Sequence, residues 1–502
     1  MRILIFHGYL LRGTGSNVYN ASLAQALARQ GHEVHLFCQD RHAEQLDWVR
    51  RSENVKIHIP DIGGLLPVYV LDRYEGFEVK TFPDLTDAEL QRYLDANVAA
   101  VREVVGDAGE PDAALANHLI MGPAILARAG LRYAVKVHGS DISYTVRPHP
   151  DRFVPYAREG TDGAAGVLAG SSHVARALFE VIPDPDLPDR TRLGPPGVDM
   201  HRFRPHPEDE ALAGLSSLAD ALAAESPSSE SDDSFGRDGP AIAEATRCWA
   251  EGDERVLFVG KLLVSKGIDL LVAAWPLVHR ARRAAGAASP RLLVIGFGAF
   301  EDGLRRLIAA LDAGDLDAAR NLAAEGRGLE GEESKPLPIL AAFLDDPPEG
   351  YAEAARDAAG SVFVGGRLEH DEVADVMPAA ETFAMPSTWP ESFGMVPAES
   401  AACGVPPVSA DHSGMREVAL LLGEALEPDL ARLLSFPVDE RAVTELAGRL
   451  EGWLDLDPER RRSAGAALSE RVEELWSWDS VARTVIAASQ GQLDDLPGVI
   501  VP

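Results

Sequence analysis

Cysteine is scarce in this chain, and its spacing excludes several kinds of site. The only three cysteines are Cys38, Cys248 and Cys403, and no two of them form a CxxC pair. An odd, widely spaced set of thiols excludes a disulfide framework and argues against a thiolate zinc site. We therefore expect a reducing compartment, with the cytoplasm as the default location.

Basic residues are also few for a chain of 502 residues. Lys and Arg together number 47 against 79 Asp and Glu, which gives a formal net charge of −32. The field of such a molecule repels nucleic acid and anionic lipid surfaces. The charge therefore disfavours general nucleic-acid binding as a function.

Long apolar runs are missing as well. The first apolar stretch, residues 1–6, is too short for a signal peptide, and no stretch approaches the length needed to span a bilayer. We therefore expect no transmembrane segment. The 46 % of apolar residues is typical of a folded globular protein, and the length predicts two or three hydrophobic cores.

Short apolar runs alternate with amphipathic segments along the chain. This alternation predicts parallel sheets covered by helices, as in doubly wound α/β folds. In the first series we expect a helix at 17–29, a helix that begins at a Thr86/Glu89 capping box, and strands at 2–6, 34–38, 113–116, 133–137 and 166–169. In the second series we expect a helix from about Lys266 and strands at 255–259, 291–295, 361–364, 382–385 and 405–409.

Two Rossmann-like domains follow from these two series. The pattern fails between them, where acidic residues and serine dominate, and a second stretch rich in Ala, Gly and acidic residues interrupts the later series. We expect an N-terminal domain at 1–204, an acidic Ser-rich linker or insertion at 205–250, a C-terminal domain at 251–470 with an insertion at about 312–350, and a closing helix and tail at 471–502.

The loop after the first strand carries Gly13 and Gly15 just before the first helix. Ligands of doubly wound folds sit at this edge, and glycine allows the backbone to approach them closely. An ordinary turn would have the same sequence. Because Val18 stands where a third glycine would complete the dinucleotide fingerprint, a nicotinamide cofactor is disfavoured.

His138 directly follows a predicted strand of the first series. Functional groups often occupy this position, although a histidine that hydrogen-bonds to loop backbone is equally common. After the next strand, Gly170-Ser171-Ser172 is expected to begin a helix through a serine N-cap, and a place beside a phosphate is the alternative for these serines.

Two of the six lysines in the chain, Lys261 and Lys266, fall in one glycine-containing loop after the first strand of the second series. Cations gathered at the carboxyl end of a strand in so acidic a protein point to a bound anion, with phosphate as the obvious candidate. Two solvated surface lysines are the alternative.

The segment 385–399 contains two carboxylates and the start of a helix. Pro397 is tolerated only in the first turn, so the helix begins near 394–396 and exposes free amides that could meet a diphosphate. Glu391 and Glu399 would be about 12 Å apart along a helix, which suits two holders of an extended ligand such as a nucleotide sugar better than a hydrolytic pair. A plain helix carboxylate is the alternative for Glu399.

No residue pattern predicts a metal site. The histidine pairs His32/His35 and His201/His206 lack ligand spacing and carboxylate partners. The Asp184-Pro185-Asp186 sequence has the form DxD, but its proline-rich setting predicts a plain turn.

In combination these motifs resemble the retaining glycosyltransferases of family four. That resemblance implies the GT-B fold, in which two Rossmann-like domains face each other across a cleft, the first on the acceptor side. The landmarks run in family order: Gly13 to Gly15, His138-Gly139-Ser140-Asp141, Gly170-Ser171-Ser172, Gly197-Val198-Asp199, Lys261/Lys266, Pro386-Ser387, Glu391/Glu399 and Trp478.

The resemblance also implies a role for each matching residue. Lys261 and Lys266 would bind the donor diphosphate and stabilise charge on the departing nucleotide; the first is commonly Arg in the family. Glu399 would hold the ribose and Glu391 the donor sugar. His138 would lie beside that sugar. The remaining expected donor contacts are Gly13, Gly15 and the backbone of Phe393, Gly394, Met395 and Val396.

The activity implied is transfer of a hexosyl unit from a nucleotide-diphosphate sugar to an acceptor hydroxyl, with retention of configuration and without a metal or other cofactor. The acceptor is open: a small molecule, a glycan or a lipid-linked sugar. Two alternatives remain open, a GT-B-fold nucleotide-sugar epimerase or phosphorylase and a non-catalytic nucleotide-sugar binding protein.

Overall fold

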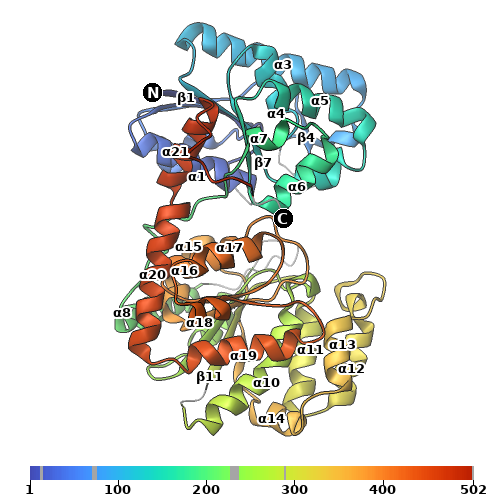
Figure 1. Ribbon diagram of the computed structural model, residues 1–502, viewed down its shortest axis with the longest axis vertical. Helices are drawn as coiled ribbons and strands as arrows, with labels where there is room; N and C mark the ends of the chain where they lie inside the picture. The colour runs from blue at the N-terminus through green and yellow to red at the C-terminus, as the bar shows by residue number, and fades with distance from the viewer. Residues whose placement is uncertain (12–14, 70–75, 226–236, 288–289, 500–502) are drawn as a thin grey trace. The chain divides into compact units, whose positions relative to one another are not determined.

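A computed structural model describes residues 1–11, 15–69, 76–225, 237–287 and 290–499. The chain divides into two compact units, Met1–Gly197 with Trp476–Pro502, and Val198–Leu475. Each unit is built on a parallel sheet flanked by helices (Figure 1). This is the two-domain α/β fold that the alternation of strands and helices predicts.

The sheet of the first unit has seven parallel strands in the order β3-β2-β1-β6-β7-β8-β9. Its central strands are buried on both faces, as expected for continuous apolar runs in a parallel sheet. All five predicted strands are confirmed, whereas the edge strands β3 and β9 were not predicted because they are short and only partly apolar. The bounds are β1 (Arg2–Phe6), β2 (Glu33–Phe37), β3 (Val55–His58), β6 (Ala113–Asn117), β7 (Ala134–Val137), β8 (Gly166–Ala169) and β9 (Thr191–Leu193). A separate pair consists of β4 (Leu65–Val68) and β5 (Glu78–Thr81).

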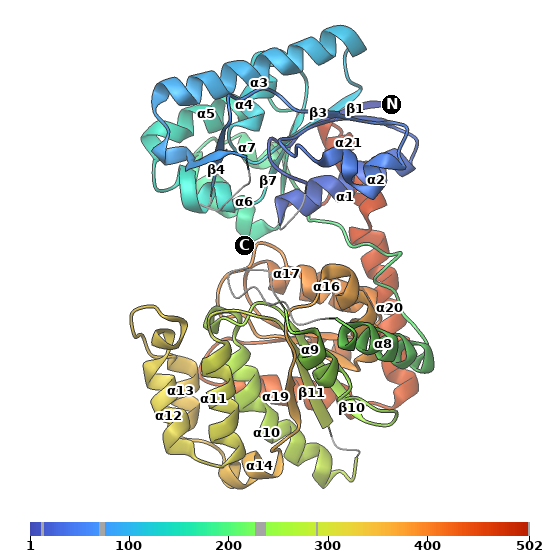
Figure 2. The ribbon, with the colours of Figure 1, turned by 180° about the vertical axis from the view of Figure 1, so that it is seen from behind.

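Helices cover both faces of this sheet, each over its own apolar core. One core contains side chains of α1 (Ser16–Arg29) and of α21 (Trp478–Ser489), which lies beside α1 although it is the last helix of the chain (Figures 1 and 2). The other core contains side chains of α3 (Asp87–Ala108), α4 (Gly122–Ala129), α5 (Pro150–Asp162) and α6 (Ser172–Val181).

Two predicted helix starts are confirmed. At α3 the Thr86 hydroxyl accepts from the Glu89 amide at 3.2 Å, and the Glu89 carboxylate accepts from the Thr86 amide at 2.8 Å. At α6 the Ser171 hydroxyl accepts from the Val174 amide. Both caps satisfy amides that have no partner within the helix.

The sheet of the second unit has six parallel strands in the order β12-β11-β10-β13-β14-β15. The five predicted strands of this series are confirmed within one or two residues at each end. The bounds are β10 (Glu254–Val259), β11 (Pro290–Ile295), β12 (Val362–Val364), β13 (Thr382–Met385), β14 (Pro407–Ala410) and β15 (Ser435–Phe436).

Helices also fill the segments of the second unit that have no strand. Within 205–250 the described residues form α8 (Glu208–Ala223) and α9 (Gly239–Thr246), which pack on each other; residues 226–236 lie outside the described part. The 298–360 region forms α11 (Glu301–Asp312), α12 (Leu316–Glu325), α13 (Pro338–Asp345) and α14 (Tyr351–Asp357), near α10 (Ile268–Ala284) in Figure 2. The unit ends with α19 (Ala442–Leu454) and α20 (Pro458–Trp476).

We find no helix in the described part of the chain with the length and apolar character needed to cross a membrane.

Candidate functional site

The two predicted lysines lie on the loop that leaves β10 at its carboxyl end. The loop passes through a 3-10 turn, Val264–Lys266, and reaches α10 by way of Gly267. Gly267 has φ 68°, and a Cβ atom there would lie 1.8 Å from the Pro386 carbonyl oxygen. Only glycine allows this contact, which presses the lysine loop against the loop that follows β13.

An ion pair joins these two loops. The Lys266 ammonium group contacts Glu391 Oε1, and both side chains are about three-quarters buried. The Ser387 hydroxyl donates to the same carboxylate oxygen at 3.0 Å, and the Ser413 hydroxyl accepts from the Glu391 amide at 2.9 Å. The structure therefore brings Lys266 and Glu391 together across 125 residues of sequence.

Lys261 stands apart from this pair. Its side chain is exposed, and among the described residues we find no hydrogen bond or ion pair to its ammonium group. A cation without a protein partner at this edge of the sheet is available to an anionic ligand.

The helix α16 (Met395–Ala402) begins where Pro397 predicts, with Gly394 as its N-cap residue. Gly394 has φ 142° and no side chain to cap the helix, so the amides of the first turn keep their hydrogen-bonding capacity. Phe393 is buried. The first turn of α17 (Ser413–Gly423) packs against it so tightly that a Cβ atom at Gly414 would lie 2.5 Å from the Phe393 backbone.

Glu399 is buried on α16, only 4 % exposed. Its Oε1 atom lies 2.7 Å from Nε2 of His370, the first residue of α15 (His370–Val376). That carboxylate raises the pKa of His370 above the ordinary value. Sequence reasoning missed His370, because its partner lies 29 residues away and no local pattern links the two.

The first unit contains the other predicted site residues. Gly15 is the N-cap residue of α1, with φ 55°, while Gly13 lies outside the described residues. His138 follows β7, and its Nε2 lies 2.6 Å from Oδ1 of Asn117 at the end of β6. Burial lowers the pKa of His138 well below the ordinary value, aided by the charge of Lys136.

Several polar residues around His138 were not predicted. Lys136 is 1 % exposed, and burial lowers its pKa to about 7. His7 is equally buried, and burial lowers its pKa to about 3. His7 and His118 both follow carboxyl ends of strands, so the position rule that pointed to His138 could have found them.

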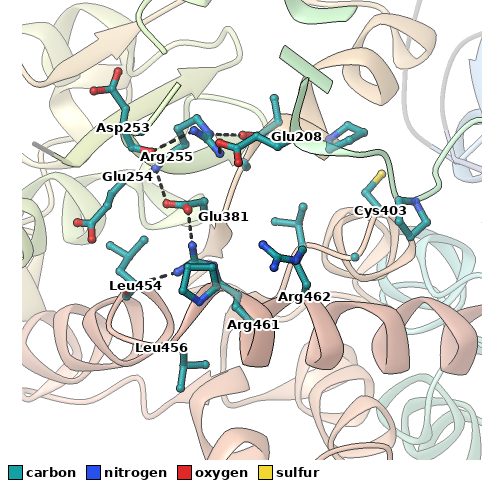
Figure 3. A pocket seen from close by; sticks show the side chains of 18 of the residues that line it. Glu208, Asp253, Glu254, Arg255, Glu381, Cys403, Leu454, Leu456, Arg461 and Arg462 are labelled. Carbon is teal, nitrogen blue, oxygen red and sulfur yellow. Dashed lines mark hydrogen bonds and ion pairs between the residues drawn. The ribbon is translucent and has the colours of Figure 1, made fainter. Parts of the chain in front are cut away.

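A cavity of about 980 Å³ lies elsewhere in the second unit, at the amino ends of β10 and β13 (Figure 3). Its charged side chains are largely occupied with one another: Arg255 donates to Glu208 at 2.8 Å, and Arg461 pairs with Glu381. Because the strands are parallel, this cavity and the lysine loop lie at opposite edges of the sheet. It therefore does not form part of the lysine site.

No group of three or more His, Cys, Asp or Glu side chains with a metal-binding arrangement occurs within residues 1–11, 15–69, 76–225, 237–287 and 290–499.

Two family models match the chain. The Glycosyl transferase 4-like domain matches residues 14–187, and the model of Glycosyl transferases group 1 matches residues 351–467. These matches cover the loops around Gly15 and His138 in the first unit and around Glu391 and Glu399 in the second.

Similar proteins cover the chain to different extents. A D-inositol 3-phosphate glycosyltransferase of Xylanimonas cellulosilytica is 25 % identical over 94 % of this chain and 90 % of its own length. A GDP-mannose-dependent monoacylated alpha-(1-6)-phosphatidylinositol monomannoside mannosyltransferase of Corynebacterium glutamicum is 26 % identical over 57 % of this chain, and the match spans 52 % of that relative. The solved structure of Anabaena Alr3699/HepE in complex with UDP-glucose has a TM-score of 0.54, 15 % identity, and coverage of 98 % of this chain and 100 % of that one.

The pairing of His370 with Glu399 predicts a pH-dependent stability. Because the pKa of His370 is raised from 6.5, the pair stabilises the fold fully below pH 6.5, and this stabilisation is lost as the pH rises through the raised pKa. We expect His370→Gln to lower the free energy of unfolding by about 1 kcal/mol at pH 5.5 and by less at pH 9. Urea denaturation at both pH values measures this, with His201→Gln, an exposed histidine of the same unit, as the control. An equal loss at both pH values would contradict the assignment.

Proposed function

Because the chain belongs to the retaining glycosyltransferases of family 4 and transfers a glycosyl unit from a nucleotide sugar, we propose that the carboxyl edge of its second sheet binds the nucleoside diphosphate of the donor. The observation that carries the proposal is the Lys266–Glu391 pair beside the uncapped start of α16. This pair and the helix start together provide a cation, a carboxylate and backbone amides at the carboxyl edge of the second sheet.

The electrostatics of this edge favour a diphosphate. A protein of net charge −32 repels anions in general, so a local cationic group must overcome that field. Lys261 supplies a charge with no competing carboxylate in contact, and Lys266 supplies one that Glu391 orients. Both would stabilise the negative charge that builds on the departing nucleoside diphosphate. Lysine in place of arginine at the first position keeps the charge but gives up bidentate geometry.

The carboxylates of Glu391 and Glu399 are proposed to bind two different parts of the donor, its sugar and its ribose. We propose that Glu391 accepts hydrogen bonds from hydroxyls of the donor sugar, because its carboxylate lies beside Lys266 and is fixed by Ser387. Glu399 would accept from the ribose. Its Oε1 is committed to His370, which leaves the second carboxylate oxygen for the ligand. The amides of Phe393, Gly394, Met395 and Val396 would contact phosphate and sugar.

The first unit would contribute uncharged contacts. We propose that His138 lies beside the donor sugar and that the backbone at Gly15 approaches the phosphates. The acceptor is proposed to be a hydroxyl of a small molecule, a glycan or a lipid-linked sugar. The names of the relatives make an inositol phosphate the first acceptor to test.

A donor screen tests this proposal. We expect UDP- or GDP-sugars to raise the melting temperature of the purified protein and to be turned over in the presence of inositol phosphate or another polyol acceptor, with the anomeric configuration retained. Saturable binding with no transfer or hydrolysis for any acceptor would contradict catalysis. Conversion of the donor sugar without an acceptor, seen by NMR, would instead identify an epimerase.

Two substitutions separate binding from turnover. Lys266→Ala removes a cation from the diphosphate, so we expect the Kd for the nucleoside diphosphate to rise about tenfold or more. Glu391→Gln keeps the size of the side chain but loses its charge, so we expect it mainly to lower kcat. Calorimetry and steady-state kinetics measure the two effects, with Lys335→Ala, an exposed lysine of the same unit, as the control. Wild-type values for both variants would refute the site.

Metal independence is a separate part of the proposal. If Lys261 and Lys266 carry the charge of the leaving group, excess EDTA should leave the transfer rate unchanged. A rate that falls with EDTA and returns with Mg²⁺ or Mn²⁺ would assign that role to a metal ion instead.

A further inference from the structure

A buried row of hydrogen bonds links Leu10 and Asn17, which follow β1 in the sequence, to His138. His138 Nε2 lies 2.6 Å from Asn117 Oδ1, and Asn117 Nδ2 lies 2.8 Å from His7 Nδ1. On the other side of its ring, His7 Nε2 lies 2.8 Å from the Leu10 carbonyl oxygen and 3.0 Å from Asn17 Oδ1. Asn117 and His7 are each 1 % exposed, so water does not compete for these contacts.

The Leu10 carbonyl oxygen sets the direction of the whole row. A carbonyl only accepts, so His7 Nε2 carries the proton and donates to it. Burial keeps His7 neutral, with a pKa of about 3, and its Nδ1 atom is therefore an acceptor. Asn117 must then present its amide nitrogen to His7 and its oxygen to His138.

A second amide supports the same direction. Asn20 Nδ2 lies 3.1 Å from His7 Nδ1 and donates also to the Ser16 carbonyl oxygen at 2.7 Å. Two amide nitrogens on one ring nitrogen are compatible only with an unprotonated His7 Nδ1.

The positions of the hydrogen atoms in this row determine which nitrogen of His138 carries the proton. Asn117 Oδ1 accepts from His138 Nε2–H, so the neutral His138 ring has its lone pair on Nδ1. The groups that face this ring are His118, at 4.9 Å between ring centres, the Tyr19 ring at 5.3 Å, and the buried Lys136 and His7. Burial, aided by the charge of Lys136, keeps the pKa of His138 low. In the described part of the chain we find no hydrogen-bond partner for its Nδ1 atom.

We propose that Asn117 and His7 are positioning residues that hold His138 as the Nε2–H tautomer and leave Nδ1 to accept a hydrogen bond from a substrate hydroxyl. The presence of substrate beside His138 rests on the proposed function, whereas the tautomer does not. The arrangement selects a ligand group that donates a hydrogen bond, and it couples the orientation of His138 to Leu10 and Asn17.

Nitrogen NMR of the full chain labelled with ¹⁵N-histidine tests the tautomer directly. His138 is assigned by the signals that vanish in His138→Gln. At pH 7 we expect a protonated Nε2 and an unprotonated Nδ1 in the wild type. A charged His138 ring, or a proton on Nδ1, would overturn the proposal.

Asn117→Asp tests the positioning role, since it keeps the shape and the acceptor for His138 but removes the donor to His7. The added carboxylate should raise the pKa of His138, so the acid limb of the kcat/KM profile should move to higher pH. Below that pKa the rate should fall about tenfold per pH unit, because the protonated ring has no lone pair.

The matched control is Asn97→Asp, another asparagine that is 1 % exposed in the same unit and bonds only to backbone. If Asn117→Asp and Asn97→Asp give the same histidine signals and the same pH profile, the positioning role is wrong. If no donor is turned over by any variant, the proposed function fails, and the NMR signals still decide the tautomer.

Discussion

The ion pair between Lys266 and Glu391 is the contact on which the candidate donor site depends. It ties the loop after β10 to the loop after β13, and the backbone contact at Gly267 makes the same connection without side chains. Ser387 and Ser413 then fix Glu391 from two further directions. As a result, a cation that would otherwise move freely in water is held at one edge of the sheet. Lys261, which has no such partner among the described side chains, adds charge there.

The candidate site residues of the two units differ in their charge. The second unit displays charge, with lysine and carboxylate groups in partial contact with water. Around His138 the first unit suppresses charge, since burial keeps His7 and His138 neutral and lowers the pKa of Lys136 to about 7. Neutral rings have defined donors and acceptors, so the direction of each hydrogen bond can be set by its neighbour.

Much of this arrangement could be predicted from the sequence. The central strands are continuous apolar runs, and the lysine loop and Pro397 are local signals at strand and helix ends. The helices within 205–250 were not predicted, because α8 is acidic on its exposed side, although its Leu215 and Leu222 are buried. His370 and Asn117 were hidden for a different reason, because each acts through a partner far away in the sequence. Such pairs are created by the packing of neighbouring helices, as for His370 and Glu399, or of neighbouring strands, as for Asn117 and His138, and not by any local spacing.

The central claim is that the lysine loop and the start of α16 form the diphosphate site. A crystal structure of the full chain with UDP or GDP tests it most directly. We expect phosphate oxygens within hydrogen-bonding distance of Lys266 Nζ and of the first amides of α16. A diphosphate found instead in the cavity beside Arg255 and Arg461, with the lysine loop unoccupied, would contradict this assignment.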